Sequence, residues 1–329
     1  MVYRIHFTSQ DLARTRIADR PLPLVELSLA IRAIQDRTQP ARLDSWRRTV
    51  SAPLTFPMRM VMELVPPVGG SPSFLSQPCT GRPEEALQAV SATPSRMIDA
   101  DLEDVAGQRE MPSWTHHLSG DVTLLKQLEI GLTGLHDRLL RPYWDQVENL
   151  LLADRAVRVD QWLKGGVERL LTQVNPRWMR WNPPVLEIRM PNGREHDVVL
   201  EGQGVLLVPS VFCARSLVDD TARPQPIVSY PAALDDPLRR LTVFTRKPAD
   251  TEGAVSTLLG QTRAAVLTLI AEHPGCSTKE LARLAGVAPA SASEHATVLR
   301  RAGLIETARG RHAVRHSATS LGIDLLNAT

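Results

Sequence analysis

Residues 258–317, LLGQTRAAVLTLIAEHPGCSTKELARLAGVAPASASEHATVLRRAGLIETARGRHAVRHS, decide the fold of the C-terminal part of the chain. Apolar residues recur at helical spacing over residues 257–272, which predicts a first helix with one apolar face. Pro274 and Gly275 follow directly and end that helix. The rest of the stretch predicts two more short helices and then a two-stranded hairpin.

The second and third helices have clear start and stop signals. Ser277 and Glu280 fit a capping box, in which the serine hydroxyl accepts a backbone N–H and the glutamate reaches back to the cap. Gly286 can adopt the left-handed conformation that ends a helix, and Pro289 suits the first position of the next one. Gly303 ends the third helix, at about residue 302. Two short helices joined by a glycine-containing turn form a helix-turn-helix.

The third helix divides into two faces at 100° per residue. The small, apolar face fits packing against the second helix and consists of Ala292, His295, Ala296 and Leu299. The opposite face is polar and partly basic and consists of Ala290, Ser293, Glu294, Thr297 and Arg301. A short polar face of this kind fits a DNA major groove.

Two strands, residues 304–308 and 312–317, are predicted to follow, with a tight turn at Gly310. Arg309, Arg311 and Arg315 are expected to contact phosphate or the minor groove. From residue 258 onward the chain has 8 Lys and Arg against 5 Asp and Glu, whereas the rest has 30 against 31. This order of elements predicts a winged helix-turn-helix that binds DNA. A winged helix that only docks proteins is the alternative.

The same stretch resembles the ArsR-type family of bacterial transcriptional regulators, over about a fifth of the chain. The likeness lies in the leading helix, in TKELARLAGV, in SASEHATVLRRAGLI and in the hairpin. It implies that five residues lie at or near DNA bases, namely Ser291, Ser293, Glu294, His295 and Thr297. Glu294 stands where Arg, Gln or Lys is usual in the family, and Ala296 where Leu is usual. A glutamate can accept a hydrogen bond from a cytosine amino group, but it also repels phosphate.

Neither ligand set of the metal-sensing members of that family is present. Those members carry a Cys-x-Cys pair in the second helix, or His and Asp ligands in a final helix. Cys276 precedes the second helix and is expected to be a small buried residue. Cys79 and Cys213 complete the cysteines without a C-x-x-C spacing, so no disulfide framework or zinc site is expected. We expect no metal or cofactor.

Composition limits the class of protein. The chain has 329 residues, of which 43% are hydrophobic, enough for two or three globular domains. Its net charge of +2 means that any nucleic-acid surface must be local. No apolar run reaches the length of a membrane span, and the opening residues lack the apolar core of a signal peptide. We therefore expect a cytoplasmic protein with no membrane contact.

The first 250 residues predict both helices and strands. Tyr3, Ile5 and Phe7 alternate as in a strand, and residues 8–11 fit a helix cap. Helices are expected at residues 22–37, 84–93, 96–106 and 122–174, the last interrupted by Pro142 and by Gly165 and Gly166, and a loop at 66–83. The leucine-rich region from residue 122 is too apolar for a solvated helix, so it must pack within its domain or against a partner chain.

Strands are expected at residues 185–190, 196–201, 204–212 and 226–231, with a hairpin at 191–193 joining the first two. The fold class is therefore α+β: a mixed front domain with a small antiparallel sheet, followed by the winged helix-turn-helix. The expected domains are residues 1–250 (helical over 121–175, sheet over 185–231) and 256–329, with a linker at 248–253.

The front part resembles a domain found ahead of ArsR-type modules in actinobacterial regulators. The likeness lies in YRIHFTSQDLARTR, LLRPYWDQVENLLLADRAVR, RWNPPVLEI, and GVLLVPSVFC with PIVSYPA. It supplies context and implies no particular chemistry for this domain.

No catalytic site is expected in the front part. His116 and His117 are adjacent, so on a strand or loop they point apart, and the HExxH spacing of a zinc site is absent. No glycine-rich phosphate loop and no G-x-S-x-G elbow occurs. Trp178 and Trp181, with Arg177 and Arg180, indicate core packing first, and a ligand pocket or dimer seam second.

Together these observations predict a transcriptional regulator, most simply a repressor that binds an inverted-repeat operator as a homodimer. Phosphate contacts are expected from Arg300, Arg301, Arg309 and Arg311. The front domain is expected to dimerise, to sense a small-molecule effector, or both. The rival hypothesis is an enzymatic front domain whose winged helix does not regulate transcription.

Overall fold

The computed structural model describes residues 2–36, 43–79, 81–190, 195–222, 224–232, 252–309 and 314–327. The chain divides into two compact units, Met1–Arg37 with Ala52–Ala233, and Thr38–Ser51 with Leu234–Thr329. Helices and small mixed sheets coexist, so the α+β class is confirmed. The short helix α3 (Asp44–Val50), far upstream in sequence, falls in the second unit. Most of the expected linker, residues 248–251, lies outside the described residues, and residues 252 and 253 begin a helix.

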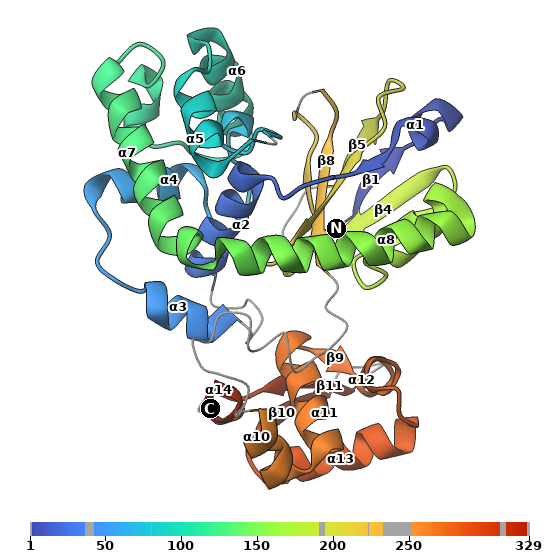
Figure 1. Cartoon of the computed structure of the whole chain (residues 1–329). Coiled ribbons are helices and arrows are strands. Elements are labelled where there is room, and N and C mark those ends of the chain that lie inside the picture. Colours follow the sequence, from blue (N-terminus) through green and yellow to red (C-terminus); the bar gives the residue numbers. More distant parts are fainter. Residues whose placement is uncertain are drawn as a thin grey trace. The chain divides into compact units, whose positions relative to one another are not determined.

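The first sheet of the first unit has the strand order β3-β4-β1-β5 (Figure 1). Its strands are β1 (Val2–His6), β3 (Met179–Asn182), β4 (Val185–Arg189) and β5 (His196–Val199). β1 pairs antiparallel with β4 and parallel with β5. The predicted hairpin between residues 185–190 and 196–201 is therefore wrong, because β1 lies between them. The alternating Tyr3, Ile5 and Phe7 supply the central strand, and residues 191–194 lie outside the described residues.

The second sheet has the order β2-β6-β8-β7, with β2 (Arg16–Ile17), β6 (Leu206–Ser210), β7 (Leu217–Asp219) and β8 (Ile227–Pro231). β6 pairs parallel with both β2 and β8, and only β7 is antiparallel. The expectation of an antiparallel sheet is therefore corrected to two mixed sheets. Four of the five residues in each of β6 and β8 are buried, which is typical of parallel strands covered on both faces.

Helices complete the first unit: the longest of them packs on both sheets, and most of the others pack on one another. Thr8 and Asp11 form the predicted capping box, with Asp11 Oδ2 accepting from the backbone N–H of Thr8 at 2.9 Å. The helices expected at residues 22–37, 84–93, 96–106 and 122–174 are confirmed to within a few residues, the last as two helices, whereas α3 and the helix Phe56–Leu64 were not predicted. The helices of this unit are α1 (Ser9–Arg14), α2 (Pro23–Gln35), α4 (Phe56–Leu64), α5 (Pro83–Ser91), α6 (Ser95–Ala106), α7 (Val122–Leu139) and α8 (Trp144–Gln173).

α8 is the longest helix and reverses direction near its end (Figure 1). Gly165 and Gly166 break the helical conformation there, as the sequence indicated, and Gly166 adopts a φ of 65°. Beyond the break, Leu170 and Leu171 pack into the core beside the first sheet. The reversal brings the end of α8 back to Arg158, whose Nη1 donates to the backbone carbonyl of Gln173 at 3.5 Å.

A buried polar cluster fixes α8 to β8. Arg158 Nη2 donates to Asp154 Oδ1 at 3.0 Å, and the hydroxyl of Tyr230 donates to Asp154 Oδ2 at 2.7 Å. The Arg158 guanidinium also lies 5.3 Å from the centre of the Tyr230 ring. All three side chains are buried, and burial raises the pKa of the Tyr230 phenol well above its usual value. One face of α8 is therefore buried in the interior of its own unit.

Candidate nucleic-acid interface

The C-terminal part of the second unit contains the predicted order of helices and strands. Its elements are α10 (Glu252–Leu259), α11 (Gln261–Glu272), β9 (Cys276–Ser277), α12 (Thr278–Ala285), α13 (Pro289–Arg301), β10 (Ile305–Arg309), β11 (Val314–Ala318) and α14 (Ser320–Asn327). The helix expected over residues 257–272 is confirmed from residue 261 onward as α11, but its first residues belong to the separate helix α10. Gly260 has a φ of 80° and separates α10 from α11, so the chain changes direction at that residue.

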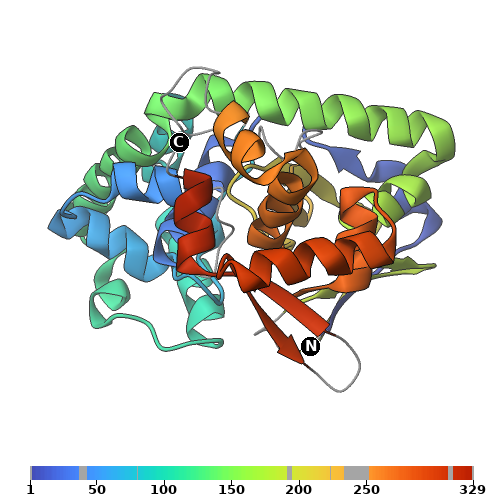
Figure 2. The ribbon, with the colours of Figure 1, turned by 90° about the horizontal axis from the view of Figure 1, so that it is seen from below.

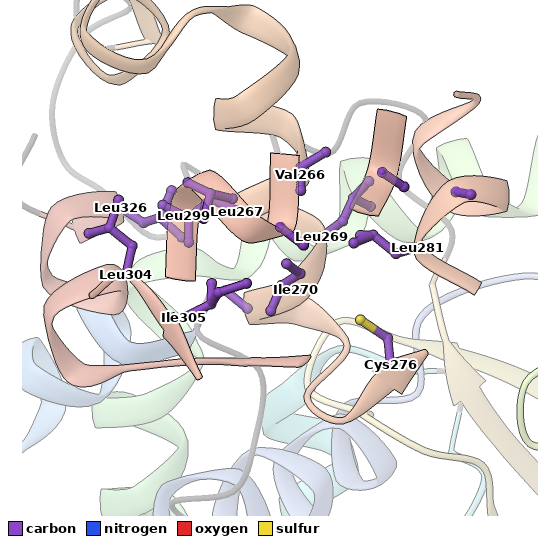
Figure 3. Packing of buried hydrophobic residues seen from close by; sticks show 14 residues of the cluster. Val266, Leu267, Leu269, Ile270, Cys276, Leu281, Leu299, Leu304, Ile305 and Leu326 are labelled. Atoms are coloured by element: carbon purple, nitrogen blue, oxygen red, sulfur yellow. The ribbon is translucent and has the colours of Figure 1, made fainter. Parts of the chain in front are cut away.

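One apolar core holds these elements together (Figure 3). α11 lies at its centre, because every residue from 266 to 272 is buried. Leu281 of α12 and Leu299 of α13 belong to the same cluster as Val266, Leu269 and Ile270 of α11, and both helices pack on α11. Cys276 is fully buried in the same core, as expected from the sequence. The helix-turn-helix therefore packs on α11 through a shared apolar core and is not an isolated pair of helices.

The turn between α12 and α13 has the geometry that its sequence predicts. The hydroxyl of Ser277 accepts a hydrogen bond from the backbone N–H of Glu280 at 3.2 Å, capping α12. Gly286 ends α12 with a φ of 64°, and the N–H of Val287 bonds back to the carbonyl of Ala282 at 3.1 Å. Pro289 opens α13 three residues after Gly286. The turn is thus closed by local hydrogen bonds that orient α13.

α13 presents the two faces expected of it. Ala292, Ala296 and Leu299 are at most 2% exposed and face the core. Ser293, Glu294, Arg300 and Arg301 are exposed, whereas Ser291, His295 and Thr297 are half-buried. The helical angle places His295 on the apolar face, whereas the family resemblance implies that it lies near DNA bases. In the structure it lies at the border between the two faces. The polar face is accessible within its own unit.

The hydroxyl of Thr297 is already engaged within the helix. It donates to the backbone carbonyl of Ser293 at 2.8 Å. Its hydrogen is therefore not available to a base, and the side chain can offer only its oxygen as an acceptor and its methyl group. Ser293 and Glu294 remain the exposed polar side chains in the first half of the helix.

The hairpin predicted after α13 is confirmed as an antiparallel pair, β10 with β11 (Figure 2). β9 adds a third strand on the far side of β11, which the sequence did not indicate. Arg309 ends β10, and nothing is described of its side chain, while Gly310 and Arg311 lie outside the described residues. Arg315 is exposed, and its Nη1 donates to the carbonyl of Gly275 at 3.0 Å. Arg315 therefore stands opposite Ser277 of β9 and belongs to the second residue pair from the turn of the hairpin.

A buried histidine links the hairpin to the helix-turn-helix, and no sequence pattern indicated it. His316 of β11 is 5% exposed and hydrogen-bonds through Nε2 to the hydroxyl of Thr278 at 2.9 Å. Its Nδ1 hydrogen-bonds to the hydroxyl of Thr307 on β10 at 3.1 Å. Burial lowers the pKa of His316, which favours the neutral ring. The ring thus connects the start of α12 with both strands of the hairpin.

Other features of this unit were also missed. Lys279 and Arg283 lie one turn apart on α12 and are exposed, and in a helix-turn-helix the first helix crosses the DNA backbone. The sequence did contain a signal for these two residues, because both lie on the polar side of an amphipathic helix. α14 packs on α11, and the hydroxyl of Thr319 before it donates to the carbonyl of Gly303 at 2.6 Å.

The candidate features of the front part lie apart from one another. His116 and His117 are exposed on a short 3-10 helix, Ser113–His117, beside a shallow recess. Asp121 caps α7 by accepting from the N–H of Thr123 at 2.7 Å. Among the described residues, no three His, Cys, Asp or Glu side chains are grouped as a metal site requires.

Trp178 and Trp181 are half-buried and line a cleft of about 320 Å³ together with three arginines. The guanidinium groups of Arg177 and Arg215 lie 5.6 and 5.4 Å from the Trp178 ring. Phe7 packs edge-on against Trp181 at 5.4 Å. Trp178 and Trp181 therefore pack against neighbouring side chains and also line a pocket, so two of the roles considered from the sequence each describe part of what the structure shows.

Comparison with known proteins supports the assignment of the C-terminal part. A family model described as a helix-turn-helix domain matches residues 259–308, which run from the end of α10 into β10. No curated protein and no solved structure matches the chain. In the part of the chain that the structure describes, no helix is both long and apolar enough to cross a membrane. The second unit therefore carries a helix-turn-helix DNA-binding domain, and the ArsR-type assignment stays a prediction.

Proposed function

We propose that this protein is a transcriptional regulator that binds an inverted-repeat operator as a homodimer and represses transcription by occupying it. One observation carries the proposal. α13 buries its small apolar side chains, Ala292, Ala296 and Leu299, and leaves its polar face exposed within its own unit. A helix held in this way can enter a major groove without rearrangement of its unit.

The exposed residues of α13 divide by their position along the helix. In helix-turn-helix proteins the N-terminal residues of the recognition helix contact base edges. Ser291, Ser293 and Glu294 occupy that part of α13, whereas Arg300 and Arg301 end it. We assign base contacts to the first group and phosphate contacts to the two arginines. Lys279 and Arg283 of α12 add charge suited to the DNA backbone.

Glu294 gives the interface a selective character. A carboxylate accepts hydrogen bonds only, so among the bases it suits the amino group of cytosine. The same charge is repelled by phosphate. Glu294 therefore lowers affinity for DNA in general while favouring a site that places a cytosine opposite it.

The first unit is proposed to dimerise the protein and to sense an effector. The cleft lined by Trp178 and Trp181 also contains Arg180 and Arg189, together with one carboxylate, Glu187, which lies opposite Arg180 on the neighbouring strand. Aromatic faces beside an excess of guanidinium groups suit a small anionic, aromatic effector. Such an effector changes DNA binding only if it binds the DNA-competent and incompetent states with different affinity.

The test is a mobility-shift series with the DNA upstream of the protein's own gene, at several salt concentrations. Specific binding should weaken steeply with salt, because arginine contacts release counterions from DNA. Replacing Arg300 and Arg301 together by Ala should lower affinity for all sequences about tenfold or more and flatten the salt slope by about two. Arg96→Ala, an exposed arginine of α6, is the matched control and should change neither.

Two results would overturn the proposal. Absence of salt-dependent binding to any duplex would favour a winged helix that docks proteins. Turnover of a metabolite that survives deletion of residues 258–329 would favour an enzymatic first unit. An unchanged salt slope in the double arginine variant would contradict only the phosphate contacts assigned to Arg300 and Arg301, and not DNA binding itself.

A further inference from the structure

α8 carries an exposed apolar stripe on the side that its own unit does not use. Leu152, Val159 and Leu163 are 43%, 39% and 83% exposed, and Ala156 between them is exposed as well. These four residues, the α8 stripe, are spaced four, three and four apart, so they form one line along the helix. This is the spacing of a and d positions in a helix-pairing heptad.

The opposite side of α8 is fully occupied. Val147, Leu151, Asp154 and Arg158 are at most 3% exposed and face the interior of the first unit. At 100° per residue, this row lies about 140° around the helix from the α8 stripe. The exposed apolar residues are therefore not the edge of the core but a second, separate face. Exposed apolar rows of this kind mark protein interaction sites.

We propose that the α8 stripe is the dimerisation surface and that it pairs with the same stripe of a second copy in antiparallel orientation. This inference rests on the homodimer of the proposed function and names its interface. A two-fold axis between Ala156 and Val159 places Leu152 opposite Leu163 of the partner subunit. It also places Ala156 opposite Val159 of the partner subunit, so that a small side chain meets a larger one at the centre of the seam.

The flanks of the stripe favour the same arrangement. In antiparallel pairing, Arg155 approaches Trp162 of the partner subunit, and a guanidinium over an indole ring is a favourable contact. Trp162 is 38% exposed in the single chain, so pairing would cover it. Asp160, on the other flank, pairs with Lys164 of its own chain at 2.7 Å. The same two-fold axis displaces Asp160 along the seam from its own copy, so the two carboxylates do not face each other.

Parallel and shifted pairings fit less well. A parallel pair would place Ala156 against Ala156 of the partner subunit and leave a gap in the seam, and it would leave Trp162 uncovered. An antiparallel shift by one heptad would set the polar side chains of Asp145 and Asn149 against the apolar residues of the stripe. Polar residues at such positions select against the wrong register. The break at Gly165 ends the helix just beyond Leu163, which also fixes the length of the seam.

The test is the molar mass of the full chain in solution, measured by light scattering without DNA. The wild type should have twice the chain mass of 36.3 kDa. Leu163→Glu and Leu152→Lys should each give the single-chain mass with an unchanged circular dichroism spectrum. Val122→Glu on α7 is the matched control, since Val122 is 80% exposed, and it should leave the dimer intact.

Mixing the two variants tests the orientation. Antiparallel pairing sets the introduced carboxylate of one variant chain against the introduced ammonium group of the other. It leaves a contact between two leucines at the opposite end of the seam, so the mixture should recover the doubled mass. A wild type of single-chain mass, a dimer that survives Leu163→Glu, or a mixture that stays monomeric would each overturn the inference. Because DNA is absent from these measurements, failure of DNA binding is a separate result.

Discussion

Two helices of this protein, α13 and α8, each bury one face in their own unit and leave the other face exposed. The exposed face of α13 holds serine, glutamate and arginine, whereas that of α8 holds alanine, valine and leucine. The difference indicates what each face is suited to bind. A polar and partly basic face gains from phosphates and base edges, while an apolar face gains only from being removed from water. Burial alone does not distinguish the two helices; the chemistry of the uncovered side does.

The largest expected effect concerns the buried face of α8. Asp154→Ala leaves the buried Arg158 guanidinium and the Tyr230 hydroxyl without their shared acceptor, so it should destabilise the first unit by about 3–5 kcal/mol. Asp160→Ala removes an equally spaced ion pair on the exposed side of the same helix and should cost about 1 kcal/mol or less. Urea unfolding followed by tryptophan fluorescence measures both. Equal effects would contradict the assignment of faces on α8.

The buried face of α13 should respond nearly as strongly. Leu299 is 1% exposed in the core beneath α13, so Leu299→Ala should destabilise the second unit by about 2–5 kcal/mol. Its neighbour Val298 is 38% exposed, so Val298→Ala should cost well under half of that. Thermal unfolding by circular dichroism compares the two variants. A similar loss in both would mean that α13 does not divide into the faces described.

The exposed face of α13 should change affinity without changing stability. Glu294→Gln removes one negative charge, so binding to DNA of unrelated sequence should tighten severalfold, while preference for cytosine at one operator position should weaken. Thermal unfolding should stay within about 0.5 kcal/mol of the wild type, as for other exposed substitutions. Competition assays with operator variants measure the preference. Tighter binding to the operator with its preference intact would reject a base-reading role for Glu294.

The smallest effect concerns pH and His316. Burial lowers the folded pKa of His316, so the unfolded chain takes up the proton more readily as pH falls. The stability from the neutral ring is complete above the unfolded pKa of about 6.5 and is lost as pH falls towards the folded value. His316→Gln should flatten that part of the pH dependence.

The measurement is the difference in unfolding free energy between wild type and His316→Gln from pH 7.5 down to pH 5. Burial also lowers the pKa of His136 in the first unit, and that contribution is common to both proteins. A difference that does not vary with pH would show that His316 titrates alike in the folded and unfolded chain.

Most of the helix-turn-helix could be predicted from the sequence because its signals act over a few residues. Ser277, Gly286 and Pro289 start and stop helices through local hydrogen bonds and backbone conformation, and the structure confirms each. Gly260 separates two helices where the sequence predicts one, because apolar periodicity continues on both sides of it. α14 was missed because it is short and depends on contacts with α11 and with the turn after α13.

The sequence by itself determined the order of α11, α12, α13, β10 and β11, the capped turn before α13 and the two faces of that helix, since periodicity and caps are properties of neighbouring residues. Only the tertiary structure decided that β1 lies between β4 and β5, that β6 and β8 run parallel, and that His316 joins α12 to the hairpin. It also decided which side of α8 is left uncovered. Each of these depends on segments far apart in the chain competing for the same buried surface, and no local pattern records the outcome of that competition.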